Sequence, residues 1–510
     1  MLIINFDSPV IKIISNYLSK IWNLLSVFIF VPLYIHYLGI ENYAVIGFYS
    51  LVLGLISFAD AGMSSAITRE FALDEKSSYK FNVLKKIERI YWLVITILCF
   101  TIALFSDLIS KKFLETNNIA LSDLKNFVIL IGIGTSLQLI SSLYFGALFG
   151  LGKQIQANNL QMIWTTARSL FVVILLAFIQ PSLYIFLIWQ IFCNVIYIIR
   201  LRNSVIVIIK PDKGEFQSVY KMTSLPPRIL KYIGGMSLVA IISAINSQAD
   251  KLVISSYFPL KVFGYYSMVS VLAQIPTLVA IPMASFIFPM LSKYADKGSD
   301  SQNFDKVFIR FVSLLYLLVI PVTLMVCFYP TELFVLWANK SIDESILPSL
   351  PLLINCLLIG SLFLAMQFPY YYVLLSKYQT KYTVYQGFLQ VMIGIPLLLF
   401  FAKFYGLKYV GVPWIIINFF ALIYLTYICF TKYIQISALT FLAKNVVPNI
   451  LVSLIVGLVG FGLYKLTSYH FIVFLIISII LSYIIIFILN NFVEKRSILD
   501  YHHLFDFPRG

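Results

Sequence analysis

The sequence predicts an all-helical integral membrane protein, and three observations carry that prediction. Apolar residues make up 60% and charged residues 12% of the 510, whereas a soluble chain carries about a quarter charged residues. The mean hydropathy is +0.92. The apolar runs are long enough to cross a bilayer as helices, at about 20 residues each. A membrane barrel would instead show alternating segments of ~10 residues.

The apolar runs predict about 14 transmembrane helices. The first run, 11–37, is too long for the core of a signal peptide, so we expect a retained helix. Helices five and six are separated by a tight hairpin at 180–182. The expected spans are 11–37, 43–66, 87–109, 127–150, 159–180, 183–200, 232–258, 264–291, 307–329, 349–375, 383–402, 409–431, 446–467 and 471–493.

The charges of the loops predict the orientation. Lys and Arg total 37 against 22 Asp and Glu, and most of them lie in the loops on one side if the N-terminus is inside. Cytoplasmic loops of membrane proteins collect basic residues, so we expect both termini to be cytoplasmic. The same rule explains the net charge of +15, and no nucleic-acid partner is expected.

The long basic loop 201–231 divides the chain into a predicted N-lobe, 1–200, and a predicted C-lobe, 232–431. Each lobe would hold six helices. A shift of 220 residues lays the first two helices over the seventh and eighth, an arrangement found in transporters built from repeats. Outside this scheme lie an appended helix pair, 446–493, which we expect to face lipid, and a cytoplasmic tail, 494–510.

The stretch 231–293 contains features that are costly in lipid. Asp250 and Lys251 lie near the outer end of the seventh helix, and Pro276 and Pro282 lie inside the eighth. Such groups are tolerated where protein or a water-filled cavity surrounds them. We therefore expect something polar to cross the membrane here.

The order of several short motifs resembles that of a known family. The first two helices carry Leu38-Gly39, Asp60-Ala61-Gly62 and Arg69, and the seventh and eighth carry Asp250-Lys251 and the run 288–292, Phe-Pro-Met-Leu-Ser. Together they resemble the Wzx-type O-antigen and polysaccharide flippases of the multidrug/oligosaccharidyl-lipid/polysaccharide (MATE-like) superfamily.

This resemblance implies a V-shaped bundle that opens alternately to each side of the bacterial inner membrane. The implied cargo is an undecaprenyl-pyrophosphate-linked oligosaccharide, an O-antigen or exopolysaccharide repeat unit, which moves from the cytoplasmic to the periplasmic leaflet. The implied partners are membrane lipids, a polysaccharide polymerase and a chain-length regulator. The appended helix pair departs from the twelve helices of many O-antigen members, which leaves a lipid II or teichoic-type flippase open.

A pyrophosphate that crosses a region of low dielectric needs cations. Lys20, Arg168 and Lys251 lie inside the expected helices and are the candidate substrate-binding residues of the cavity. Lys20 could instead snorkel to the inner surface or pair with Asp60, and Arg168 could pair with a carboxylate. Asp60 and Asp250 are the candidate coupling or gating residues, with proton or sodium as the coupling ion; a structural contact is the alternative for Asp250.

Enzyme chemistry is not expected. The four histidines have no metal-ligand spacing, and no phosphate-cradling Gly-rich loop or catalytic Ser turn occurs. The five cysteines fall in apolar helices and are read as small apolar residues. We expect no metal and no cofactor. The alternative function is a cation-coupled drug or metabolite antiporter of the same superfamily.

Overall fold

All regular elements of the described residues are helices. The structure is a computed structural model and describes residues 9–60, 62–73, 75–116, 118–210, 227–295, 301–338, 342–467 and 470–494. The helices group into two units, 1–268 and 269–510, which are described separately. The predicted tail, 494–510, lies almost entirely outside the described residues.

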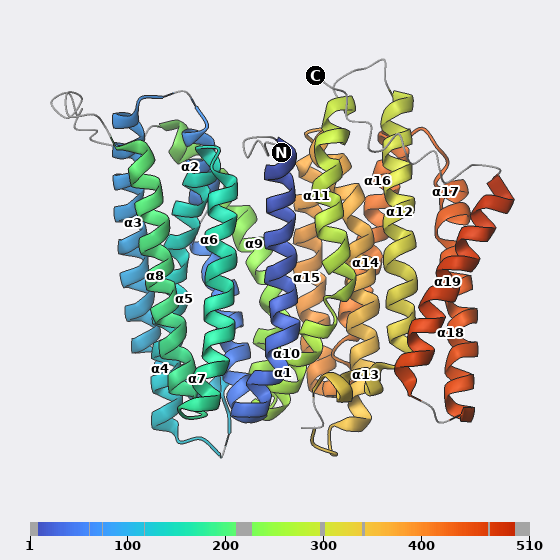
Figure 1. Cartoon of the computed structure of the whole chain (residues 1–510), viewed down its shortest axis with the longest axis horizontal. Helices are drawn as coiled ribbons and strands as arrows, with labels where there is room; N and C mark the ends of the chain where they lie inside the picture. Colours follow the sequence, from blue (N-terminus) through green and yellow to red (C-terminus); the bar gives the residue numbers. More distant parts are fainter. Residues whose placement is uncertain are drawn as a thin grey trace, which may run out of the picture. The chain divides into compact units, whose positions relative to one another are not determined.

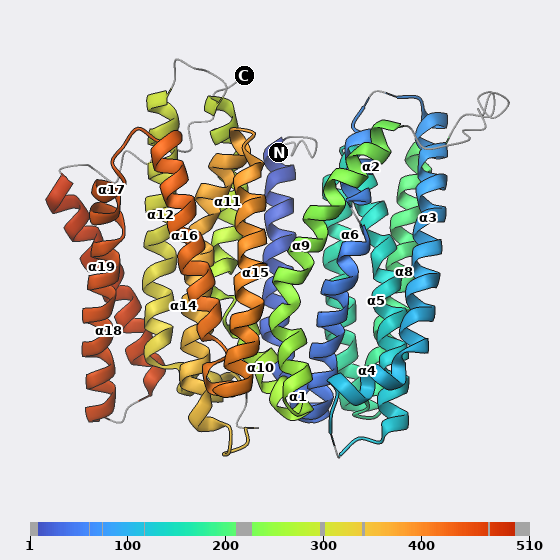
Figure 2. The ribbon, with the colours of Figure 1, turned by 180° about the vertical axis from the view of Figure 1, so that it is seen from behind.

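Unit 1 is a bundle in which α3, α5, α6 and α8 run side by side (Figures 1 and 2). Its short helix α2 lies at the same end as the start of α1, and α4 lies at the opposite end. Its elements are α1 (Pro9–Ile56), η1 (Ser57–Asp60), α2 (Met63–Phe71), α3 (Ser77–Leu104), α4 (Ser106–Phe113), α5 (Leu121–Gly150), α6 (Gln154–Thr166), η2 (Ala167–Phe171), α7 (Val172–Phe178), α8 (Leu183–Ile209), α9 (Pro227–Tyr257) and the first residues of α10 (Leu260–Leu272).

Helix α1 contains the first expected span and residues 43–56 of the second, with its helical backbone interrupted at Gly39 (φ 77°, ψ 168°). The second span was expected to run to residue 66, but the α-helix ends at Ile56 and the chain continues as η1 and α2. A positive φ is readily adopted only by glycine. The chain reverses there, so the two halves of α1 run in opposite directions (Figure 2). The turn expected after residue 37 is therefore present, and its position is set by the Leu38-Gly39 pair.

Close packing of α2 against α5 depends on two glycines one helical turn apart. A methyl group on Gly146 would lie 2.7 Å from the Ser64 carbonyl oxygen, and one on Gly150 would lie 2.4 Å from that of Thr68. The Thr68 hydroxyl donates to the Gly146 carbonyl at 2.9 Å. Small residues that let helix backbones approach and hydroxyls that bond across them are typical of membrane interfaces.

The second half of α1 packs on α10 through residues that are 220 positions apart. A methyl group on Gly264 would lie 3.1 Å from Cβ of Ala44, and one on Gly47 would lie 2.6 Å from Oγ of Ser267. Residues at equivalent positions of the two predicted repeats therefore touch each other. The 220-residue repeat itself stays a prediction.

Unit 2 contains a core of buried apolar side chains from α11, α12, α14 and α16. A separate small cluster around Tyr329 joins the end of α12 to α18 and α19, which pack on each other and on α12 (Figures 1 and 2). The elements are α11 (Ile275–Ala295), α12 (Ser301–Phe328), α13 (Pro330–Trp337), η4 (Leu347–Ser349), α14 (Leu350–Ser376), α15 (Thr380–Phe404), η5 (Leu407–Tyr409), α16 (Val412–Lys432), α17 (Ala438–Asn445), α18 (Val447–Thr467) and α19 (Phe471–Glu494).

The chain is a multi-pass membrane protein. Within the described residues, 11 helices are long and apolar enough to cross a membrane, or up to 12 if one bent pair counts as a single span. The longest of these stretches, Ile14–Asp60, covers most of the first two spans expected from the sequence. The total of about 14 stays a prediction.

Helix α8 extends beyond the expected end of the sixth span. It continues to Ile209, and α9 begins at Pro227, so only 211–226 of the predicted linker 201–231 lies outside the described residues. Leu201, Val205 and Ile209 are buried in the core of unit 1, which is why the helix continues there. The lobe boundaries 1–200 and 232–431 remain a prediction.

Candidate functional site

A cavity of about 680 Å³ lies inside unit 1, at the end where α2 packs on α5. Its volume falls within the range of small-molecule sites, about 300–1,000 Å³. Among the described residues that line it, Asp60 is the only charged one. The other lining residues are hydroxyl-bearing (Ser50, Ser57, Ser64, Ser65, Thr68, Thr135, Ser141, Ser142), amide (Gln138, Gln161), aromatic (Phe145, Phe149, Trp164, Tyr197) or small and aliphatic (Leu53, Gly54, Ile56, Leu139, Gly146).

Asp60 ends η1 and is held by hydroxyl groups from three helices. Its Oδ2 accepts from the Ser64 hydroxyl of α2 at 2.7 Å, and its Oδ1 accepts from the Ser142 hydroxyl of α5 at 2.9 Å and from Tyr91 of α3. Its carboxylate lies at the start of α2, where an anion is favoured by the helix dipole. The Ser64 amide also donates to it, at 3.4 Å.

A seam of polar side chains joins α1 to α6 next to this cavity. The Ser19 hydroxyl donates to Gln161 at 3.2 Å, and the Trp22 indole donates to the Thr166 hydroxyl at 3.0 Å. Lys20 follows Ser19 but is exposed. It forms no hydrogen bond or ion pair with any described residue, so Lys20 and Asp60 are not paired in this conformation.

Arg168 lies in the π-helical turn η2, which interrupts the helix between α6 and α7. Such turns occur often at functional sites. Its half-buried guanidinium lies over the ring of Trp164, with Cζ 4.6 Å from the ring centroid. In the part of the chain that the structure describes, no carboxylate pairs with it. Because Trp164 lines the cavity, the Arg168 cation lies beside the cavity without being part of its lining.

Trp164 is fixed by two further contacts. Its ring stacks on Tyr197 of α8, with centroids 4.8 Å apart and an interplanar angle of 14°. Its indole donates to Oδ1 of Asn194 at 3.2 Å. The cation and the cavity wall are therefore held together by one oriented aromatic side chain, since its ring contacts Arg168 and Tyr197 and its single donor has an acceptor.

The second pair of charged residues lies on α9. Asp250 is half-buried, and its Oδ2 accepts from the Tyr266 hydroxyl of α10 at 2.7 Å. Lys251 is also half-buried and has no hydrogen-bond or ion-pair partner among the residues described. Neither lines the cavity next to Asp60. The structure therefore does not bring the five predicted site residues to one place: Asp60 and Arg168 are neighbours of the cavity, and the other three are not.

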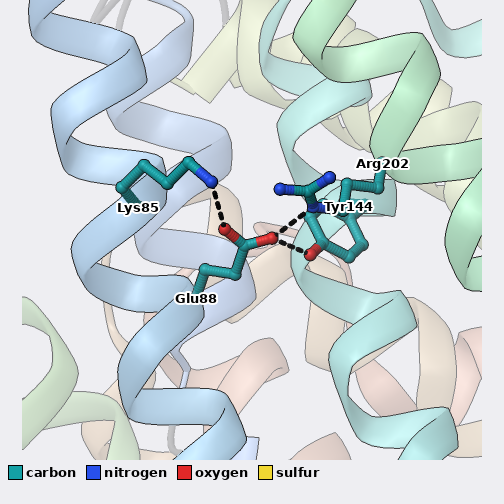
Figure 3. A network of polar contacts seen from close by, with 4 residues as sticks. All are labelled: Lys85, Glu88, Tyr144 and Arg202. Atoms are coloured by element: carbon teal, nitrogen blue, oxygen red, sulfur yellow. Dashed lines mark hydrogen bonds and ion pairs between the residues drawn. The ribbon is translucent and has the colours of Figure 1, made fainter.

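An ion-pair network around the buried Glu88 joins α3, α5 and α8 (Figure 3). Glu88 is 7% exposed, and its Oε1 lies 2.6 Å from Nε of Arg202 and accepts from the Tyr144 hydroxyl. Nζ of Lys85 lies 3.4 Å from the other carboxylate oxygen. These residues were not predicted, although an acidic residue at the start of an apolar span was a usable signal.

The sequence reasoning also missed Trp164, Tyr197 and Tyr91 as parts of the site. No local pattern marks them, because each is an aromatic residue in an apolar helix. Ser142 and Gln161 were visible as polar residues in such helices, but their partners Asp60 and Ser19 lie 82 and 142 positions away.

The profile of the family described as "Polysaccharide biosynthesis protein" matches residues 10–295. That is more than half of the chain, so the chain belongs to this family. The predicted resemblance to polysaccharide flippases of the MATE-like superfamily is confirmed at this level. No curated protein sequence matches the chain.

The fold is also found among solved transporter structures. A structure of the lipid II flippase MurJ in an inward closed conformation is similar with a TM-score of 0.70 and 18% identity, covering 97% of this chain and 99% of that one. An inward-facing MATE family multidrug resistance transporter gives 0.59 and 14%, covering 79% and 92%. The Vibrio cholerae MATE transporter VcmN in its bent form gives 0.54 and 12%, covering 84% and 98%.

These likenesses define the fold class as a helical membrane transporter fold of the MurJ and MATE type, as predicted. The match to MurJ covers 97% of the chain, so it includes most of α18 and α19. The appended helix pair is therefore part of a fold that recurs in a solved structure.

Proposed function

We propose that this protein is a flippase that moves an undecaprenyl-pyrophosphate-linked oligosaccharide from the cytoplasmic to the periplasmic leaflet of a bacterial inner membrane by alternating access. The observation that carries the proposal is Arg168, a cation without a described carboxylate partner on a π-turn beside a polar cavity, in a chain of the polysaccharide biosynthesis family. A guanidinium binds phosphate through two parallel hydrogen bonds.

In this proposal Arg168 binds the pyrophosphate, and Lys20 and Lys251 supply further positive charge along the path. None of the three is neutralised by a described carboxylate. An unpaired cation at membrane depth is costly, and an anionic cargo would offset that cost when it binds. Asp60 and Asp250 would then act in gating or in coupling to a proton or sodium ion, because both carboxylates connect different elements of unit 1.

Complementation tests the function. A strain deleted for its own flippase would express this protein with the matching sugar-synthesis cluster, and surface polysaccharide would be measured. We expect the parent chain to restore polymer. We expect Arg168→Ala to lower the export rate by roughly 10- to 100-fold, the equivalent of a charged hydrogen bond of about 1.5–3 kcal/mol. Arg200→Ala is the matched control, since Arg200 is exposed on α8.

The outcome that would contradict the proposal is glycolipid that accumulates inside the cell while the parent chain is abundant in the membrane. Equal export by Arg168→Ala and Arg200→Ala would leave flipping intact but would remove Arg168 from the site. Arg168→Lys should recover only part of the activity, because lysine keeps the charge but not the planar fork or the stacking on Trp164.

A cation-coupled drug or metabolite antiporter is the second candidate. It is favoured by a cavity whose described lining contains one carboxylate and aromatic rings but no Lys or Arg, and by the likeness in fold to MATE transporters. Proton-driven or sodium-driven accumulation of ethidium in inside-out vesicles would support it. A lipid II-type cargo is tested by growth of a strain depleted of its own lipid II flippase.

A further inference from the structure

We propose that the cavity beside Asp60 is a carbohydrate subsite that binds the first sugar of the glycolipid, the one attached to the pyrophosphate. The proposal rests on the proposed function and adds a substrate class to it. It assigns the sugar and the phosphate to different neighbours of Trp164: the sugar to the cavity that Trp164 lines, and the phosphate to the guanidinium 4.6 Å from its ring.

The hydrogen-bonding character of the cavity is the first argument. Seven of its eight serine and threonine hydroxyls already donate within the protein, mostly to backbone carbonyls of their own helices. The eighth, that of Ser65, has no acceptor among the described residues. A hydroxyl that has used its proton still offers acceptor lone pairs. Asp60 is a further acceptor, and the side-chain oxygen of Gln138 is buried without a partner among the described residues. The cavity therefore offers an excess of acceptors.

An acceptor-rich cavity fits a sugar and does not fit a phosphate. Sugar hydroxyls are donors and would satisfy the free lone pairs and the unpartnered Gln138 oxygen. A pyrophosphate offers acceptors only and needs cations or several free donors. The described lining contains no Lys or Arg, and its side-chain donors without a described acceptor include the amide nitrogens of Gln138 and Gln161 and the Ser65 hydroxyl. The single charge of that lining, Asp60, would repel it. The phosphate is therefore expected outside the cavity, at Arg168.

The aromatic lining completes the chemistry. Phe145 and Phe149, one turn apart on α5, are both half-buried with ring centroids 4.7 Å apart. They give the cavity an apolar wall against which the C–H face of a sugar ring can pack, while polar groups orient it. Because Asp60 disfavours a second anion, the subsite should accept neutral and amino sugars and reject uronic acids.

The test is protection of a reporter cysteine from chemical labelling in the purified full-length protein. Ser65→Cys places a thiol in the cavity lining at an exposed position whose hydroxyl has no hydrogen-bond partner among the described residues. The five native cysteines are buried or half-buried, and the parent chain gives their background. The control is Asn203→Cys, which is exposed on α8 outside the cavity. A neutral maleimide is the label.

The probes are methyl N-acetyl-α-glucosaminide, glucuronic acid and inorganic pyrophosphate. At nine times its dissociation constant, the glycoside should slow labelling of Ser65→Cys about tenfold and leave Asn203→Cys unchanged. Glucuronic acid and pyrophosphate should not protect. Gln138→Leu should weaken protection by the glycoside. Gln138→Asn is the second variant if the leucine variant does not fold: it keeps the amide but moves its oxygen by one methylene, and it should also weaken protection. In the background Asp60→Asn, glucuronic acid should begin to protect.

Three outcomes would overturn the subsite. The first is protection by pyrophosphate and not by the glycoside. The second is equal protection of the Ser65→Cys thiol by the glycoside with and without Gln138→Leu. The third is no protection by any probe in a protein that restores polymer in the complementation assay. Protection by the glycoside in a protein that never exports polymer would instead refute the flippase and leave the carbohydrate site standing, so the two failures are distinguishable.

Discussion

Removal of the Arg202 charge should destabilise unit 1, because Glu88 would stay buried with less compensation. Glu88 is 7% exposed and lies 2.6 Å from Nε of Arg202. Loss of one partner of a buried ion pair costs about 3–5 kcal/mol. Here Lys85 remains 3.4 Å away and the Arg202 side chain is 35% exposed. We therefore expect Arg202→Met to lower the free energy of unfolding by about 2–3 kcal/mol, below the full range.

The size of the coupling between the two charges is a sharper test than either single variant. In Glu88→Leu/Arg202→Met both charges are gone, and the main remaining cost is the buried Tyr144 hydroxyl without its acceptor, about 1–3 kcal/mol. The double variant should thus lose clearly less stability than the sum of the two single variants.

Thermal melting of the purified protein, followed by tryptophan fluorescence in one detergent, measures these differences. Arg200→Met is the control, because Arg200 is exposed two positions before Arg202. A melting temperature for Arg202→Met that equals that of Arg200→Met would refute the reasoning. So would strict additivity in the double variant, because it would mean that Glu88 and Arg202 do not interact in the folded protein.

Three further predictions concern contacts within unit 1. Asp60→Leu should lower the free energy of unfolding by about 1–3 kcal/mol, because hydroxyls of three helices lose their acceptor, whereas Asp60→Asn should cost less; equal melting temperatures for the two variants would contradict this. Gly150→Leu should displace α2 and abolish export, since even a methyl group would lie 2.4 Å from the Thr68 carbonyl oxygen, while Gly462→Leu, with open space around it, should melt and export like the parent. Tyr266→Phe removes the 2.7 Å hydrogen bond to Asp250 and should lower the free energy of unfolding by about 1 kcal/mol. A change in the pH or sodium dependence of export beyond this loss of stability would show that Asp250 acts in coupling, and an unchanged dependence would leave Asp250 a packing contact only.

Hydropathy and the length of the apolar runs predicted the class of fold because both report on short windows of sequence, whereas the orientation expected from the loop charges stays a prediction. A run of about 20 apolar residues can be placed stably across a bilayer as a helix whatever its neighbours are. The turn at Gly39 was equally readable, because only glycine adopts its backbone conformation at low cost. The end of the sixth helix could not be read in this way. A basic residue such as Arg202 suggests a cytoplasmic loop, but here it lies within α8 and is bonded to Glu88, 114 positions earlier.

The candidate site was predicted in part for the same reason. Charged residues inside apolar spans are conspicuous, so Asp60 and Arg168 were found, and the structure places both next to one cavity. What surrounds them was not predictable, because the partners Tyr91 and Ser142 lie 31 and 82 positions from Asp60.

The sequence by itself determined that this chain crosses a membrane as a helical bundle, where most of its spans lie, and which charged residues fall inside apolar stretches. Those properties follow from the transfer free energies of individual side chains, which add along a helix. The tertiary structure decided which of these charges are neutralised, which lack a described counter-charge, and that a cavity rich in acceptors lies beside such a cation. Hydrogen bonds and ion pairs require atoms within about 3 Å, and only folding brings residues from distant helices to that distance.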